Sequence, residues 1–178
     1  MYRILDGMTR MLAPILAFTG EEIWEAMPHD SGADTGNVLY NDMPAYDEAA
    51  ALSPGQAAKW DKLIALRADV NRALEQARNE KLIGKSLEAN VTLYITDPSL
   101  LEASRGVNLA ELCIVSSADV VNGEGKGFAG AAEGLTVSVS PAGAPKCVRC
   151  WMHSNHVGES ENHPELCPRC AAVVGEQG

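Results

Sequence analysis

The spacing of apolar positions divides this chain into helical, irregular and extended stretches. In residues 1–27 the apolar side chains recur every three or four positions, as they do on one face of a helix (Ile4, Leu5, Met8, Met11, Leu12 and Ile15). Pro14 lacks a backbone N–H, so we expect it to interrupt that helix. Thr19 and Glu22 then match a capping box, which predicts the start of a second helix that ends near Met27.

The middle of the chain begins with a polar stretch and continues with the best helical pattern. Residues 29–55 are rich in Asp, Gly, Asn, Ser and Pro, which indicates a loop with a short extended piece at 38–40. A helix is predicted at about 54–82, with Ser53 as its N-cap and Pro54 at its first position. Its stripe at helical spacing consists of Trp60, Leu63, Arg67, Val70, Leu74 and Ala77, flanked by Ile64 and Leu66.

Beyond this helix the period of the pattern changes from that of a helix to that of a strand. β-Branched, alternating runs predict four strands, at 91–95, 113–116, 119–121 and 135–139. Short helices are expected at 98–105 and 107–112, and a glycine-rich hairpin or loop at 123–130. The stretch 141–145, Pro-Ala-Gly-Ala-Pro, then predicts a linker into a cysteine-rich tail.

Composition narrows the classes of protein to which the chain can belong. No run of about 18 apolar residues and no secretory leader are present, so we expect a cytosolic protein without a membrane partner. The net charge of −10 argues against a free-standing nucleic-acid binder, which usually carries a basic surplus. Half of the 14 basic residues nevertheless lie between 56 and 85, and they are Lys59, Lys62, Arg67, Arg72, Arg78, Lys81 and Lys85.

The tail carries two C-x-x-C pairs separated by sixteen residues, Cys147 with Cys150 and Cys167 with Cys170. This spacing is typical of structural zinc sites, in which two turns direct four thiolates to one tetrahedral ion. Four protein ligands leave no open coordination position, so we expect one structural Zn²⁺ and no catalytic metal. About thirty residues are too few to bury a core of their own, and metal binding must stabilise the fold.

The cysteines and the nearby histidines have other possible roles besides a four-cysteine zinc site. A thioredoxin-like redox pair would leave the second C-x-x-C unexplained. A histidine between the two pairs (His153, His156 or His163) is an alternative fourth ligand, although four cysteines suffice. Cys113 lies in an apolar run and is interpreted as a core residue.

Three segments together resemble bacterial isoleucyl-tRNA synthetases. The first pair followed by Trp151, with the second pair sixteen residues later, is similar to the zinc finger shared by those enzymes and Fpg-type DNA glycosylases. Residues 12–24, LAPILAFTGEEIW, resemble the end of the helical anticodon-binding domain of the Ile, Val and Leu synthetases. Residues 83–89, IGKSLEA, resemble the segment after the long basic helix of the isoleucine enzyme.

The resemblance implies an α+β protein of several parts. The parts are the end of a helical anticodon-binding bundle at 1–50, a junction domain with a long basic helix and a small mixed sheet at 54–141, and a four-cysteine zinc finger at 145–173. The HIGH and KMSKS signatures of class I synthetases are absent, so we expect a C-terminal fragment without catalytic residues. Met43 stands where the family pattern has Trp, which concerns only the register of the 38–45 loop.

The implied partners are the anticodon arm of isoleucine tRNA and the rest of the synthetase, which would carry out ATP-dependent isoleucylation. The candidate tRNA-binding residues are Arg149, Trp151, Arg169, Lys59, Arg67, Lys81 and Lys85. Trp151 has two interpretations at this point, a platform for an RNA base or a cover for the zinc sulfurs. A phosphate loop at 84–86 is excluded, since the required glycine five positions earlier is Asn79.

Two alternative functions from other classes share the cysteine pattern. The DNA-binding half of an Fpg-type glycosylase would need an N-terminal catalytic proline, whereas this chain starts Met-Tyr-Arg. A zinc-ribbon module for protein–protein contact fits the acidic composition. Binding to tRNA or to duplex DNA distinguishes these alternatives.

Overall fold

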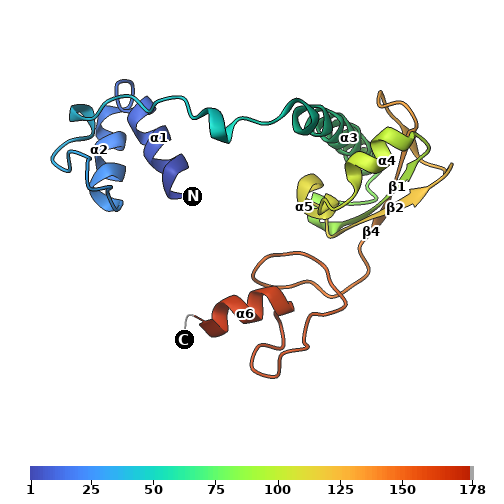
Figure 1. Cartoon of the computed structure of the whole chain (residues 1–178). Helices are drawn as coiled ribbons and strands as arrows, with labels where there is room; N and C mark the ends of the chain where they lie inside the picture. The colour runs from blue at the N-terminus through green and yellow to red at the C-terminus, as the bar shows by residue number, and fades with distance from the viewer. Residues whose placement is uncertain (177–178) are drawn as a thin grey trace. The chain divides into compact units, whose positions relative to one another are not determined.

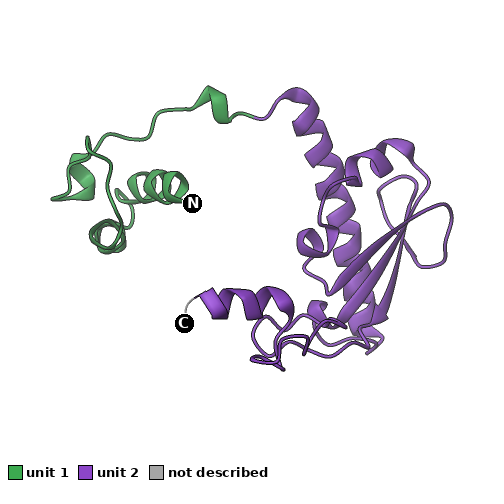
Figure 2. Ribbon diagram, turned by 60° about the horizontal axis from the view of Figure 1, so that its bottom comes forward, with its two compact units in different colours: residues 1–51 green, residues 52–178 purple. Residues whose placement is uncertain are grey.

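The computed structural model describes residues 1–176 and divides the chain into two compact units, residues 1–51 and residues 52–178 (Figure 2). The predicted class is confirmed, since helices, a small mixed sheet and a cysteine-rich tail are all present (Figure 1). None of the described helices combines the length and the apolar composition that crossing a bilayer requires.

The first unit is a helical pair around one tryptophan. Helix α1 spans Tyr2–Leu12 and helix α2 spans Ala17–Ala26, so the interruption at Pro14 is found as predicted. Trp24 is fully buried, and its indole N–H donates to the carbonyl of Asp34 at 3.0 Å. The small core is completed by Ala13, Met27 and Val38.

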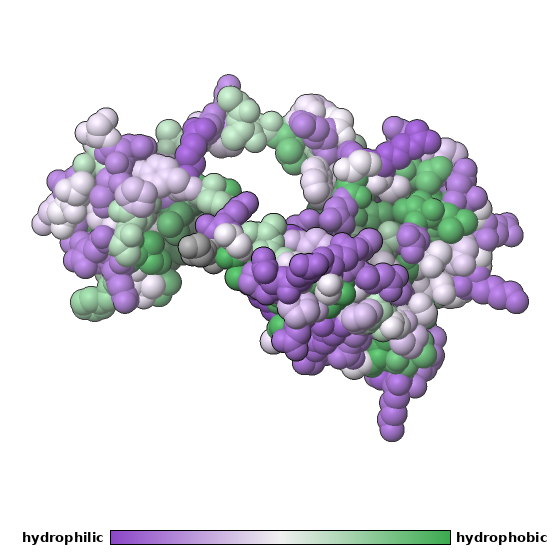
Figure 3. Space-filling model, turned by 90° about the horizontal axis from the view of Figure 1, so that it is seen from below, coloured by the Kyte–Doolittle hydropathy of each residue, from purple (hydrophilic) through white to green (hydrophobic). Residues whose placement is uncertain are grey.

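Much apolar surface of this unit is left uncovered by that core. The side chains of α1 and the following turn that stay exposed are Ile4, Leu5, Met8, Met11, Leu12, Ile15 and Leu16, and in α2 Phe18 is 94% exposed. Figure 3 shows one face of the molecule, with hydrophobic residues at the surface of this unit on the left. This unit therefore exposes a larger set of apolar side chains than is usual for a helical pair that packs against nothing else.

Two local predictions in this unit were wrong. The capping box at Thr19 does not form, because α2 already begins at Ala17, directly after the turn at Pro14, with Leu16 as its N-cap and no side-chain cap. The piece at 38–40 is not extended but is a 3₁₀ helix, η1 (Val38–Tyr40), since the Asn37 side chain accepts from the amide of Leu39 and turns the chain. A second 3₁₀ turn, η2, spans Glu48–Ala50.

The second unit is built on a four-stranded sheet of order β2-β1-β4-β3. The strands are β1 (Ala89–Ile95), β2 (Ser117–Asn122), β3 (Phe128–Ala129) and β4 (Leu135–Pro141). Strand β1 pairs in parallel with β2 and antiparallel with β4, which makes the sheet mixed. Alternate residues of β1 are buried on one face. That face packs in one apolar cluster with α3 (Pro54–Asn79), α4 (Pro98–Ser104) and α5 (Leu109–Cys113).

Helix α3 starts as predicted, with Ser53 and Gln56 forming a capping box ahead of the sheet-facing stripe. Leu63, Val70, Leu74 and Ala77 of the predicted stripe are buried. Leu66 is buried as well, whereas Ile64, Trp60 and Arg67 lie toward solvent, so the buried face is rotated slightly from the predicted one.

The helix ends at Asn79, three residues before the predicted end at 82. The amide of Lys81 donates to the carbonyl of Arg78, and that of Leu82 donates to Ala77, as in a Schellman motif. Lys81 itself has φ 60, in the left-handed region that usually favours glycine. Because position 81 is a lysine and not a glycine, the sequence pattern did not indicate a helix end there. The predicted end of α3 was therefore placed later, at 82.

The predicted strand at 113–116 was wrong. Cys113 ends α5, which is capped at its start by the Asn108 side chain, and Ile114 then takes a left-handed conformation with φ 56. The prediction of Cys113 as a core residue is confirmed, since it is 3% exposed. Burial raises the pKa of the Cys113 thiol to about 11, despite the nearby Arg67, so this thiol stays protonated and unreactive at neutral pH.

A buried carboxylate joins α3 to the glycine-rich loop, a feature that the sequence pattern did not predict. Asp69 is 1% exposed and accepts from the amides of Ala131 at 3.1 Å and Ala132 at 2.7 Å. It also pairs with Arg72 on the next turn of the helix. Gly130 lies so close that a Cβ there would fall 2.1 Å from the Asp69 carboxyl carbon. The loop is thus held against α3 by hydrogen bonds to a charged group.

Candidate metal centre and nucleic-acid interface

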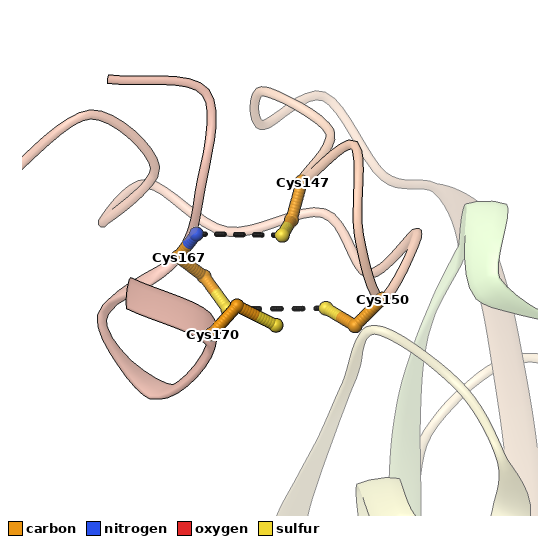
Figure 4. A group of neighbouring side chains, drawn as sticks. All are labelled: Cys147, Cys150, Cys167 and Cys170. Carbon is orange, nitrogen blue, oxygen red and sulfur yellow. Dashed lines mark hydrogen bonds between the residues drawn. The ribbon is translucent and has the colours of Figure 1, made fainter. Parts of the chain in front are cut away.

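The four cysteines of the tail meet at one point (Figure 4). Their four sulfur atoms all lie within 4.8 Å of one another, and those of Cys150 and Cys167 are 3.8 Å apart. Four sulfurs bound at about 2.3 Å to one tetrahedral zinc ion would lie about 3.8 Å from each other. The donor set and its spacing therefore fit a four-thiolate zinc centre.

Local hydrogen bonds shape the first cysteine pair. The amide of Cys147 donates to the carbonyl of Met152, and the amide of Trp151 donates back to the carbonyl of Cys147, both at 2.9 Å. A bridge between Lys146 and His153 closes this turn. These contacts point both sulfur atoms of the pair toward the second pair.

The second pair opens a helix that was not predicted, α6 (Pro168–Glu176). Pro168 is well suited to the first turn, where its missing N–H is not needed. The Cys167 amide donates to the sulfur of Cys147 at 3.4 Å, and the Ala171 amide donates to the Cys167 carbonyl at 2.9 Å. The helix start thus directs the sulfur atoms of Cys167 and Cys170 toward those of the first pair.

The protonation of the sulfur atoms is divided between opposing influences. Burial opposes the Cys147 thiolate, but the amides of Cys150, Cys167 and Arg149 outweigh it and lower the pKa of Cys147 to about 6. Burial, and then the neighbouring cysteine side chains, raise the pKa of Cys167 to about 11. Sulfur atoms packed this closely cannot all ionise without a cation among them, which is the charge balance that a bound divalent metal supplies.

Two of the three histidines between the pairs, His153 and His156, have other partners. His153 donates its backbone amide to the Ser116 hydroxyl at 2.7 Å, and its Nδ1 lies 2.7 Å from the carbonyl of Ala144. His156 pairs with Glu159 at 2.5 Å. Among the described residues, the group of candidate metal ligands contains the four cysteines and no histidine.

Trp151 lies at the surface of the finger (residues 145–173) and not over its sulfur atoms. The indole is 55% exposed, and the apolar side chains packed on the cysteines are those of Val157 and Leu166. Two ammonium groups approach its ring, Lys85 at 5.5 Å and Lys146 at 5.8 Å from the ring centroid. The half-exposed indole thus makes two cation–π contacts at the surface of the finger.

Arg149 and Arg169 each lie inside one of the two C-x-x-C turns, which we call knuckles. Both are exposed, and both guanidinium groups lie close to cysteine sulfur atoms. The guanidinium of Arg149 donates to the sulfur of Cys170 at 3.8 Å. Arg169 lies beside the Cys150 sulfur, which raises the pKa of its guanidinium. Both therefore add positive charge to the outside of the sulfur cluster.

The predicted basic residues of the helical segment fall into two groups. Lys59 donates to the carbonyl of Arg105 at 3.3 Å, and Arg67 is exposed farther along α3. The other group, Lys81 and Lys85, follows the helix end. At 1.5 Å rise per residue, Lys59 lies about 30 Å from that end of α3. Only the second group adjoins Trp151, through Lys85.

Two basic residues near this surface were not among the candidate tRNA-binding residues. Lys146 immediately precedes Cys147 in the sequence, and this position beside the first C-x-x-C turn could have indicated that it lies near Trp151. Arg78 lies on α3, where it pairs with Glu75 and donates to the Ser86 hydroxyl at 2.6 Å. Their neighbourhood depends on the packing of the finger on the end of α3.

Comparison with known proteins agrees with these features. Residues 145–173 match the family described as a zinc finger found in FPG and IleRS, and residues 1–93 match the anticodon-binding domain of tRNA ligase. The chain is 41% identical to the isoleucine–tRNA ligase of Syntrophotalea carbinolica over 99% of its own length, and 42% identical to that of Shouchella clausii over 98%. It is 40% identical to the Colwellia psychrerythraea enzyme over its whole length.

The lengths of these proteins differ greatly. The chain spans 19% of the Syntrophotalea and Shouchella enzymes and 20% of the Colwellia enzyme, about a fifth of each. The predicted likeness to isoleucyl-tRNA synthetases is thus confirmed along nearly the whole chain. Since the anticodon-binding family matches more than half of its residues, the chain belongs to the anticodon-binding domain family of tRNA ligases.

Proposed function

We propose that this chain is the tRNA-binding C-terminal region of an isoleucine–tRNA ligase and that it contributes recognition of the anticodon arm. The observation that carries this proposal is the similarity of about 40% identity that extends from the helical pair through the finger. The exposed Trp151 with Lys85 and Lys146 supports it with a surface of suitable chemistry. The chain itself would carry out no catalytic step.

The finger would hold one zinc ion through Cys147, Cys150, Cys167 and Cys170. Four thiolates close the coordination shell, so the ion would serve the fold. Very little apolar surface surrounds the cysteines, and metal binding would supply the free energy that keeps this segment ordered. Trp151 depends on that order, because it follows the first pair directly.

Anticodon bases are unpaired, so they are available to stack on an exposed indole. We propose that Trp151 accepts one such base and that Lys85 neutralises a neighbouring phosphate. Arg149 and Arg169 would extend the positive surface along the knuckles. Lys59 and Arg67 would contact the backbone elsewhere, along α3. With a net charge of −10, binding by the chain alone should be weak and strongly dependent on salt.

The remainder of the ligase would lie in the same polypeptide. Relatives are about five times longer, and the apolar side chains of α1 are exposed in this unit, as expected where further helices pack. That remainder would carry out the ATP-dependent charging of tRNA with isoleucine in the cytosol. This chain lacks the HIGH and KMSKS signatures of that chemistry.

Filter binding at low salt tests the proposal with isoleucine tRNA and with the same tRNA carrying a changed anticodon. We expect the wild-type chain to prefer the first, and Trp151→Ala to lose about 1–3 kcal/mol of binding along with the preference. Trp60→Ala is the matched control, since Trp60 is a partly exposed tryptophan on α3. Equal binding of both tRNAs by wild-type and Trp151→Ala protein would rule out anticodon recognition, and preference for duplex DNA would favour the glycosylase alternative.

A further inference from the structure

An open cavity of about 460 Å³ lies where the end of α3 meets the finger. Its wall includes Arg78 and Lys81 from the helix end, Glu88 from the strap (residues 81–88) and His153 from the finger. No side chain fills this space, although it is bordered by two cations. Leu82, Ile83, Gly84, Pro141 and Ala142 complete the wall, so its cationic side chains are those of Arg78 and Lys81.

The backbone at Lys81 gives independent evidence that this side chain has a role. Lys81 occupies the left-handed position of the Schellman motif, where glycine would be free of strain. A side chain with a Cβ destabilises this conformation, so the position by itself favours glycine. Trp151, on the finger, and Ile114, which follows α5, show the same feature with φ 66 and φ 56. Non-glycine residues held in this region often mark functional sites.

Basic and acidic groups both border the cavity. Arg78 and Lys81 line it, and two further lysines, Lys85 and Lys146, lie against the Trp151 ring. Glu75 pairs with Arg78. The Glu88 carboxylate accepts from the amides of Lys85 and Gly84, which lower its pKa, so it is ionised and partly occupied by its own strap. Of the two cations in the wall, Arg78 is therefore paired with Glu75, whereas Lys81 has no ion-pair partner among the described residues.

The carbonyl groups at the end of α3 do not cancel this charge. Those of Ala77 and Arg78 accept from the amides of Leu82 and Lys81, so the negative end of the helix is covered there by backbone donors. An anion in the cavity would meet the side chains of Arg78 and Lys81 before it met a free carbonyl of these two residues.

We propose that this cavity binds a phosphodiester group of the RNA backbone, with Lys81 as its main ligand and Arg78 as a supporting charge. The inference rests on the proposed function, because it places the phosphate near the nucleotide whose base stacks on Trp151. Lys85 lies four residues after Lys81 and contacts the Trp151 ring. It would therefore link the phosphate subsite at Lys81 to the base subsite at Trp151. Lys81 thus contributes affinity at the expense of helix-end stability.

The test uses Lys81→Gln and Lys81→Gly in the full 178-residue chain, with isoleucine tRNA binding measured between about 50 and 200 mM salt. Both variants should bind more weakly at 50 mM. In a plot of log affinity against log salt, the slope should become less steep by about 0.7–0.9 in each variant. The affinity advantage of the wild type should therefore shrink about threefold over this range. Lys81→Gly should also melt about 2–4 °C higher than the wild type, while Lys81→Gln should melt unchanged.

The matched control is Lys126→Gln, which removes the same charge from an exposed position in the glycine-rich loop. Its slope should stay at the wild-type value. If wild-type protein fails to bind tRNA at all, the proposed function fails. If wild-type protein binds and both Lys81 variants keep its slope, the phosphate site is wrong while the proposed function stands.

Discussion

The α+β body (residues 54–141) and the finger are parts of one unit, yet they bury different kinds of side chains. In the body, leucine, valine and isoleucine side chains from α3, α4, α5, β1 and β4 form one continuous cluster. In the finger the buried residues are Cys147, Cys167 and Cys170, with only Val157 and Leu166 as apolar neighbours besides Cys150. The body can therefore be stabilised by the hydrophobic effect, whereas the finger would be stabilised by the zinc ion that we propose it binds.

The surface that we propose for RNA binding would lie at the edge of the stable core of the body. The body supplies Lys81 and Lys85 at the end of α3, and the finger supplies Trp151 and Lys146. The Ser116 hydroxyl connects the two, since it donates to the carbonyl of Leu87 at 2.5 Å and accepts from the amide of His153. Removing the metal, the core or this connection should therefore have separable effects.

Metal removal should have the largest effect. A strong chelator, or Cys170→Ser, should remove stabilisation on the order of 10 kcal/mol from the finger and leave the body folded. Hydrogen exchange would show amides of the finger losing protection while those of β1 and β4 keep theirs. Cys113→Ala is the control, because Cys113 lies in the body and should not alter bound zinc. Unchanged protection in metal-free protein would contradict the distinction between the two regions.

A cavity in the body should have a smaller effect on a different region. Leu74→Ala removes a side chain that is 1% exposed and should cost about 2–5 kcal/mol of unfolding free energy. Urea denaturation measures this loss, and zinc content under native conditions should stay unchanged. Ile64→Ala provides a matched aliphatic change on the same helix at a position 61% exposed, where less than about 0.5 kcal/mol is expected. Equal losses for both variants would mean that the buried face of α3 has been misassigned.

The connection between the regions should give the smallest effect. Ser116→Ala removes a donor and an acceptor at once and should cost about 1–2 kcal/mol. In Ser116→Ala, the His153 amide should exchange its hydrogen faster than in the wild type, while the bound zinc should be retained. Ser116→Thr keeps the hydroxyl and should restore protection there. If the His153 amide keeps full protection in Ser116→Ala, the finger is held on the body by other contacts.

The sequence by itself determined the features that depend on near neighbours. The spacing of the cysteines predicted that four sulfur atoms would meet, because each C-x-x-C turn directs two side chains to one point. Ser53, Pro54 and the apolar stripe likewise predicted the start and the buried face of α3 closely. In these cases the physical cause lies within a few residues of its effect.

Only the tertiary structure decided which distant residues become neighbours. Asp69 holds amides more than sixty residues away, and Lys146 shares the Trp151 ring with Lys85. The left-handed backbone at Lys81, Ile114 and Trp151 was equally hidden, because none of them is the glycine that such a conformation favours. These features arise from the packing of elements against each other, and that packing overrides the preference of each residue taken alone.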